Sequence, residues 1–159
     1  MALTNEIAEL AFKVEKFAAK SATVEFPKDG EKIQVELEND NQRMKFHLNV
    51  IRSLRQPKQV TFNLRYREVY SIRRLDLFGN HNNPEIDAPA PIFKNYVGHK
   101  FRQEDHVHIH DEAFGDKWAI PLKDLPEIGI EDSDTLPEKL SKFLSYCNVR
   151  GLEFTLPIF

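Results

Sequence analysis

The sequence predicts an α+β fold, with an antiparallel sheet of about six strands and an N-terminal and a C-terminal helix packed on one face. Three observations support this prediction. Apolar residues recur at helical spacing near the N-terminus, they alternate with polar residues through the middle of the chain, and a helix-capping sequence stands near the C-terminus. Because the chain has 159 residues and no break in composition, we expect a single domain over residues 1–159.

The first predicted element is an amphipathic helix within residues 4–22, with Thr4 or Asn5 as its N-cap. Its apolar stripe consists of Ile7, Leu10, Ala11, Val14, Phe17 and Ala18. We expect this stripe to be buried against the inward side chains of the sheet.

Alternation of apolar and polar residues predicts four strands after this helix. The first two, around residues 33–38 and 44–50, form a hairpin across the turn ENDNQ, and the third, residues 60–67, follows a proline. The fourth, residues 70–77, loses its alternation at Arg73 and Arg74, which indicates a β-bulge or a strand with functions on both faces. Together these strands form an antiparallel meander with one buried face.

Residues 79–104 contain three prolines and two glycines, which predicts a long irregular connection of the kind that is usually functional. A strand with alternating histidines follows, then a short strand within KWAIPL and an acidic connection at residues 123–134. The sequence TLPE supplies a capping box for a helix that ends before Gly151, and LEFTLPIF is predicted as the last strand.

Composition excludes several classes of protein. The apolar runs are too short to span a bilayer and the N-terminus lacks a signal-peptide pattern, so we expect a cytoplasmic protein with no membrane partner. The single cysteine, Cys147, excludes an internal disulfide framework, and we assign it no role.

The charge of the chain is unevenly distributed. The net charge is −3, yet residues 43–74 hold nine basic residues and one acid, whereas residues 124–138 hold six acids and no base. Such a local basic segment can bind phosphates.

Three of the six histidines lie in EDHVHIHDE, residues 104–112. On a strand, His106, His108 and His110 point to one face while the residues between them join the core. Two alternate histidines can bind one metal ion, either His106 with His108 or His108 with His110. The third ligand would be His81, His99 or a nearby acid. Because no second ligand motif accompanies the histidines, a metal hydrolase is the less favoured interpretation, and we assign no metal and no other cofactor.

The leading hypothesis is a metal-independent ribonuclease, because imidazoles carry protons near neutral pH and arginine stabilises the charge of a phosphorane. The candidate catalytic residues are His81, His108, His110 and Arg73. The candidate nucleic-acid-binding residues are Arg65, Arg67, Arg74 and Trp118, with Tyr66 and Tyr70 as further residues for stacking on bases. The mechanism requires the histidine strand to pair beside the fourth strand, so that these groups line one concave surface.

Residues 74–122 resemble a small uncharacterised family of bacterial and phage-borne proteins. The resemblance is carried by an Arg-x-Asp strand, a Gly-x-His-x-Asn-Pro loop, a His-x-His strand and a Trp-Ala-x-Pro-Leu ending. It implies no function, but it implies that the following residues belong to one unit: Arg74, Asp76, His81, Asn83, Pro84, His108, His110 and Trp118. The pattern does not require His106, so it indicates His108 and His110 as the functional pair.

We therefore expect a toxin-like protein of a phage or mobile element that engages RNA or another nucleic acid. The alternative is a non-enzymatic inhibitor or interaction module whose arginine and aromatic side chains dock on a protein partner.

Overall fold

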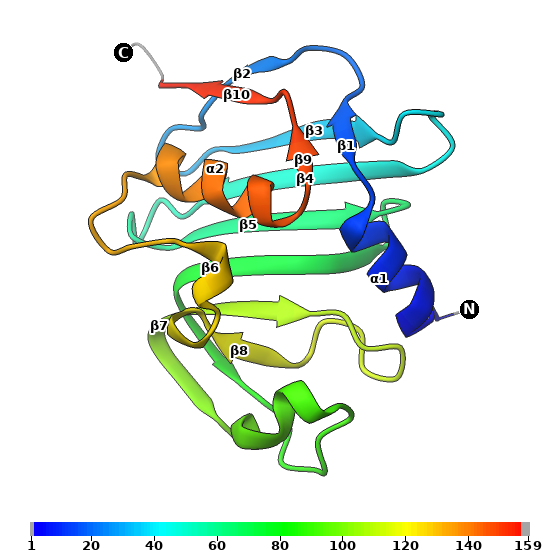
Figure 1. Cartoon of the computed structure of the whole chain (residues 1–159). Helices are drawn as coiled ribbons and strands as arrows, with labels where there is room; N and C mark the ends of the chain where they lie inside the picture. Colours follow the sequence, from blue (N-terminus) through cyan, green and yellow to red (C-terminus); the bar gives the residue numbers. More distant parts are fainter. Residues whose placement is uncertain (1, 157–159) are drawn as a thin grey trace.

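A curled, eight-stranded sheet forms the centre of the fold in the computed structural model, which describes residues 2–156 (Figure 1). The strand order is β8-β7-β6-β5-β4-β3-β1-β9, and every neighbouring pair is antiparallel except β1 and β9. The strands are β1 Lys16–Ala18, β3 Lys32–Glu38, β4 Lys45–Arg52, β5 Val60–Tyr66, β6 Tyr70–Asn82, β7 Lys100–Ile109, β8 Ala119–Pro121 and β9 Val149–Arg150. A separate parallel pair joins β2 (Thr23–Glu25) to β10 (Glu153–Thr155).

The α+β class is confirmed, but the predicted six-stranded, purely antiparallel sheet is wrong in two respects: the sheet has more strands, and it contains a parallel pair. The additional strands β1 and β9 are three and two residues long. Segments this short show no alternation, and only their long-range partners make them strands. Residues 157–159 of the predicted last strand lie outside the described residues.

The two α-helices, α1 (Asn5–Lys13) and α2 (Leu136–Tyr146), lie on the same face of the main sheet (Figure 1). The predicted capping box is present, because Thr135 Oγ1 accepts from Glu138 N and the Glu138 carboxylate accepts from Thr135 N. Short 3-10 helices are η1 Pro91–Tyr96, η2 Leu122–Asp124 and η3 Pro126–Ile128. Within residues 2–156, no helix is long and apolar enough to cross a membrane.

The predicted apolar stripe of the first helix is wrong for Ile7 and Leu10, whereas Ala11 is buried and Val14 packs against the core. Helix α1 ends at Lys13, where the chain turns into β1. The buried ammonium of Lys16 donates to the carbonyls of Phe12 and Val14 at this end of the helix. Ala8 and Ala11 face the core, while Ile7 is 40% and Leu10 is 59% exposed. The helix therefore approaches the sheet through its small residues, and its larger apolar residues lie at the rim.

The predicted irregularity at Arg73 and Arg74 is a β-bulge, since the register of β5 and β6 shifts between Leu64 and Arg65. Arg73 pairs with Leu64 and points under the helices, where its guanidinium lies 3.9 Å from the centre of the Phe12 ring. Arg74 points to the opposite face. The prediction that Arg73 shares a surface with the histidines is therefore corrected, because the two neighbouring arginines are separated by the sheet.

The predicted irregular connection at residues 79–104 is shorter than expected. Strand β6 continues to Asn82 and β7 begins at Lys100, so the connection spans residues 83–99 and contains η1. The register of β6 and β7 shifts on both sides of Gly79, and Phe78 and Gln103 have positive φ angles of 54° and 48°. These irregularities bend the β6–β7 hairpin until the ring of His81 faces His108.

Candidate functional site

Two rows of side chains cross the sheet on the face opposite the helices, which we call the outer face. Cross-strand pairing aligns Gln34, Asn49, Asn63, Arg74 and His108 in one row. The neighbouring row consists of Lys32, Ile51, Thr61, Asp76 and His106. Directly opposed residues on paired strands are close neighbours, so Arg74 meets His108 and Asp76 meets His106.

The ends of these rows form a histidine cluster, which we define as Arg74, Asp76, His81, His106 and His108. Asp76 Oδ2 lies 3.4 Å from His106 Nε2 and 3.2 Å from His108 Nε2. Arg74 Nη2 lies 2.9 Å from His108 Nε2. The His81 ring centre is 4.5 Å from that of His108, so the cluster brings together residues of β6 and β7 that are far apart in the sequence.

Hydrogen bonds to backbone carbonyls determine the tautomers of the two buried histidines. His106 Nδ1 lies 2.7 Å from Glu104 O, and His108 Nδ1 lies 2.7 Å from Asp116 O. A carbonyl only accepts, so each Nδ1 carries a proton and donates it. In the neutral rings, each Nε2 atom then carries a lone pair near Asp76, and that of His108 accepts from Arg74 Nη2 at 2.9 Å. His106 Nε2 has no hydrogen-bond partner among the described residues, although its ring is completely buried.

Gly79 allows the backbone to pack closely against this cluster. A Cβ atom at Gly79 would lie 3.1 Å from His106 Cε1 and 3.2 Å from Asp76 Cβ. A side chain there would press on both residues, so the glycine permits the close approach that holds them together.

The electrostatics of the cluster favour a cation over an anion. Arg74 bonds to Asp76 Oδ2 at 3.2 Å and to Asp116 Oδ2 at 2.8 Å, so one guanidinium faces two carboxylates. Burial alone would raise the pKa of Asp76, but the contacts with the His106 and His108 imidazoles and the Arg74 charge outweigh it and hold that pKa well below its usual range. With neutral histidines, Arg74, Asp76 and Asp116 together therefore carry a net negative charge.

His81 differs from the other two histidines because its ring is only partly buried. Burial and the neighbouring His108 lower its pKa, although a hydrogen bond to Lys117 O opposes this effect. Its Nε2 donates to Lys117 O at 2.9 Å, so Nδ1 of the neutral ring is free to accept a proton.

A groove on the outer face leads to the cluster. One hollow, of about 520 Å³, is lined by Arg74 and Asp76 among others, and a second, of about 510 Å³, contains Lys32 and Arg65. Ile51 and Asn63 line both hollows, so the two hollows are adjacent, and we call them together the groove. The sequence prediction that Arg65 and Arg74 share a surface is consistent with this arrangement.

The side chain of Arg65 crosses the floor of the groove. It donates to Asn49 Oδ1, to Gln34 Oε1 and to the carbonyl of Glu68, which are all neutral acceptors. Its charge therefore remains available to an anion in the groove.

Several predicted site residues lie elsewhere. Strand β7 ends at Ile109, and His110 Nε2 donates to Leu3 O at 2.9 Å, away from the cluster. Trp118 is completely buried between Phe93 and Phe114, so the prediction that it stacks on a base is wrong.

Two further candidates are also outside the groove. Tyr66 is buried in the core, and Arg67 lies exposed on the β5–β6 turn with its guanidinium 4.8 Å from the centre of the Tyr66 ring. His99 pairs with Glu104 at 3.1 Å and does not join the cluster. The sequence resemblance placed Asp76 in one unit with Arg74, His81 and His108, but sequence reasoning gave Asp76 no role in the site and preferred His110 to His106.

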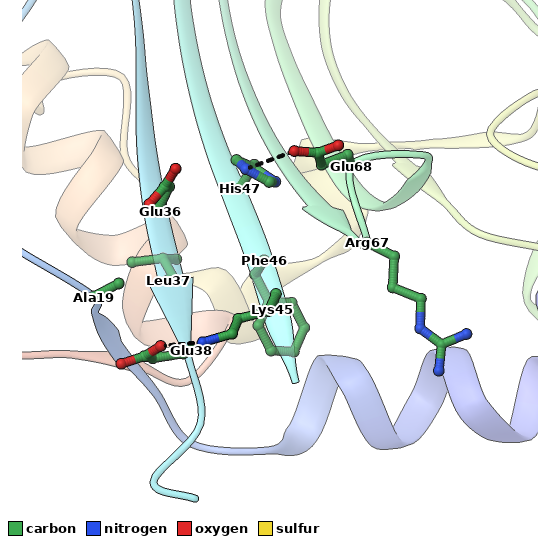
Figure 2. Close-up of a pocket in the computed structure, with 9 residues that line it drawn as sticks. All are labelled: Ala19, Glu36, Leu37, Glu38, Lys45, Phe46, His47, Arg67 and Glu68. Carbon is green, nitrogen blue, oxygen red and sulfur yellow. Dashed lines mark hydrogen bonds and ion pairs between the residues drawn. The ribbon is translucent and has the colours of Figure 1, made fainter. Parts of the chain in front are cut away.

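A separate hollow of about 430 Å³ lies over β3 and β4 (Figure 2). Its ionic groups are largely paired with one another: Lys45 Nζ lies 2.6 Å from Glu38 Oε2, and His47 Nε2 lies 3.6 Å from Glu68 Oε1. Figure 2 shows the Arg67 side chain pointing away from the His47–Glu68 pair. Four of the titratable groups that line this hollow are therefore engaged with one another.

Comparison with known proteins identifies one family. A family model described as "Family of unknown function (DUF6978)" matches residues 3–149. No curated protein and no solved structure matches the chain. An uncharacterised family is what the sequence resemblance implied, whereas its four motifs and the phage origin stay predictions.

Proposed function

The chain belongs to the family of unknown function DUF6978, and we propose that it binds single-stranded RNA along the outer face of its sheet and cleaves it at the histidine cluster. The observation that carries this proposal is the row of polar side chains from Gln34 to His108. At about 4.8 Å between neighbouring strands, the row is roughly 19 Å long. It therefore offers an extended polar surface that leads to Arg74, at the partly exposed edge of the histidine cluster.

Charge and hydrogen bonding along the groove suit a nucleic acid strand. Lys32 and Arg65 supply positive charge, and Asp76 is the one acid among the described residues that line the two hollows. The amides of Gln34, Asn49 and Asn63 both donate and accept hydrogen bonds, as recognition of exposed base edges requires. A single strand presents those edges to a flat surface, whereas a duplex pairs them.

The cleavage step uses His81 as the base. In its neutral form, His81 accepts the proton of a ribose 2′-hydroxyl, and the 2′-oxygen forms a bond to the adjacent phosphorus. The bond from phosphorus to the 5′-oxygen of the next nucleotide breaks, and that oxygen takes up a proton from water. His81 then releases its proton to solvent, which leaves a 2′,3′-cyclic phosphate and a 5′-hydroxyl.

We predict that binding of a fluorescent single-stranded RNA weakens steeply with salt, and that Arg65→Ala reduces the slope of log affinity against log salt by about 0.7. Fluorescence anisotropy at several salt concentrations measures this slope. The matched control is Lys94→Ala, which removes an exposed cation on η1, outside the groove. Failure of the wild-type protein to bind RNA at low salt, or a slope unchanged by Arg65→Ala, would contradict the proposal.

Cleavage is tested separately from binding. His81→Ala should lower the rate by roughly 100-fold or more while RNA binding is retained, because loss of a general base affects the chemical step. An oligonucleotide with a single 2′-deoxy substitution should bind but resist cleavage at that position. Equal cleavage there would exclude the 2′-oxygen as nucleophile.

A non-enzymatic protein-binding module is the second candidate, and the exposed apolar residues of α1 favour it. Ile7 and Leu10 lie on the outside of the helix, where they are suited to a protein partner. Salt separates the two functions, because an interface centred on apolar anchors changes little with ionic strength.

A further inference from the structure

The proposed cleavage step requires a positive charge that the protein side chains of the cluster do not supply. A phosphorane needs a cation beside its oxygens. Arg73 lies on the other face of the sheet, and Arg74 is neutralised by Asp76 and Asp116. Asp76, one of the two carboxylates that neutralise Arg74, also converges with the ligand atoms of His106 and His108.

We propose that Asp76, His106 and His108 form a binding site for a divalent transition-metal ion of the zinc class. The ligand atoms of these three residues all lie within 4.8 Å of one another. Oδ2 of Asp76 is 3.4 Å and 3.2 Å from the Nε2 atoms of His106 and His108. Tetrahedral zinc with ligand distances of about 2.0–2.1 Å places its ligand atoms about 3.3 Å apart, so both distances from Asp76 Oδ2 already match.

The hydrogen bonds around the site orient all three ligands. Both histidines donate from Nδ1 to a backbone carbonyl, which leaves Nε2 free to bind a metal. Asp76 Oδ1 accepts a hydrogen bond of 2.8 Å from Thr61 Oγ1, which leaves Oδ2 as the ligand atom. The unpartnered, buried Nε2 of His106 is the group that a metal ion would satisfy.

Arg74 is the group that competes with the ion. Its Nη2 lies 2.9 Å from His108 Nε2, so an entering ion must displace this contact. Nη1 bonds to Asp116 Oδ2 at 2.8 Å, on the side of the guanidinium away from this contact. Because a positive charge repels a metal ion, removing it should strengthen binding. A purely structural role of Arg74 would not produce that result.

A bound ion would be the cofactor of the cleavage site; its catalytic role, but not its binding, rests on the proposed function. Three protein ligands leave a fourth position, which a phosphate oxygen from the groove can occupy. An ion there would stabilise the negative charge of the phosphorane as a Lewis acid.

The experiment is a competition titration of the untagged, full-length protein with Zn²⁺ and a chromophoric chelator at pH 7. We expect one Zn²⁺ per chain. His106→Ala and Asp76→Asn should abolish tight binding, Thr61→Val should weaken it by roughly 10- to 100-fold, and Arg74→Gln should strengthen it. The control His110→Ala removes an imidazole outside the cluster and should bind as the wild type does. Circular dichroism verifies that each variant is folded.

Two spectroscopic measurements distinguish a metal site from an ion pair between Asp76 and a doubly protonated His106. Co²⁺ should give the intense visible bands of a four-coordinate site, and the ¹⁵N spectrum should show His106 and His108 protonated at Nδ1 alone. A folded wild-type protein that binds Zn²⁺ no tighter than His106→Ala, with His106 doubly protonated, would overturn the inference.

The two proposals fail in different ways. RNA cleavage that persists at full rate in a chelator, in protein that contains no metal by elemental analysis, would overturn the catalytic role of the ion. Stoichiometric Zn²⁺ without any RNA binding or cleavage would overturn the proposed function and leave the metal site in place.

Discussion

At the scale of single residues, Lys16 shows how a buried charge can be accommodated. Its side chain is completely buried, and its ammonium donates to the carbonyls of Phe12, Val14 and Cys147 at 2.7–2.8 Å. Burial lowers its pKa to about 8, so the group remains mostly charged at neutral pH. One cation therefore serves the carboxyl ends of both α1 and α2, where the helix dipoles favour positive charge.

We predict that Lys16→Met destabilises the protein by roughly 2–5 kcal/mol, because it leaves three carbonyls without their donor in the interior. Urea unfolding at pH 7 measures the difference. Lys13→Met, which removes an exposed lysine from the same helix, should change the stability by less than about 0.5 kcal/mol. Equal stability of the Lys16 variant and the wild type would show that its hydrogen bonds contribute nothing.

At the scale of elements, the register of a helix on the sheet depends on residue size as well as periodicity. Helix α1 has a helical repeat of apolar residues, yet Ala8 and Ala11 form its buried side. Small side chains bring the helix backbone close to the sheet, which improves packing over the whole contact. The same helix therefore presents a partly apolar outer side to solvent.

We predict that Ala11→Leu destabilises the protein by about 1–3 kcal/mol through overpacking, although leucine favours helix formation nearly as well as alanine. Leu10→Ala, one position earlier, should cost less than about 0.5 kcal/mol because Leu10 is largely exposed. Thermal or urea unfolding compares the two variants. A larger loss for Leu10→Ala would reverse the assignment of the buried face.

At the scale of the whole molecule, the sheet separates two chemical environments. One face holds the core and the two helices, and the other carries polar rows that end at the histidine cluster. Strand β7 of the bent β6–β7 hairpin contributes to both environments: Val107 lies in the core, while His106 and His108 belong to the outer face. Global stability should therefore respond to the charge state of the cluster.

We predict that acid unfolds the protein partly through Asp76. Its folded pKa is held below the unfolded value of about 3.9, so its contribution to stability is fully present above that value and is lost as pH falls through the folded pKa. Urea unfolding from pH 7 to pH 3 should show the stability difference between wild type and Asp76→Asn shrinking at the acid end. A difference that is constant over this range would mean that Asp76 has an unperturbed pKa.

The local features of this fold could be predicted from the sequence because they depend on near neighbours. The capping box at Thr135, the alternation in β3 to β5 and the bulge at Arg73 are each set by residues a few positions apart. The juxtaposition of Arg74 with His108 also followed from pairing the histidine strand beside the fourth strand. The class of the fold and part of the site were thus determined by the sequence alone.

Only the tertiary structure decided which groups meet at the cluster. Asp76 reaches His106 because two register shifts around Gly79 bend β6, and such shifts depend on contacts between distant residues rather than on local pattern. His110 leaves the cluster because β7 ends one residue earlier, and Trp118 is buried because η1 brings Phe93 against it. The alternation of side chains along a strand predicts the face of the sheet on which each side chain lies. Which other side chains it meets on that face depends on long-range packing.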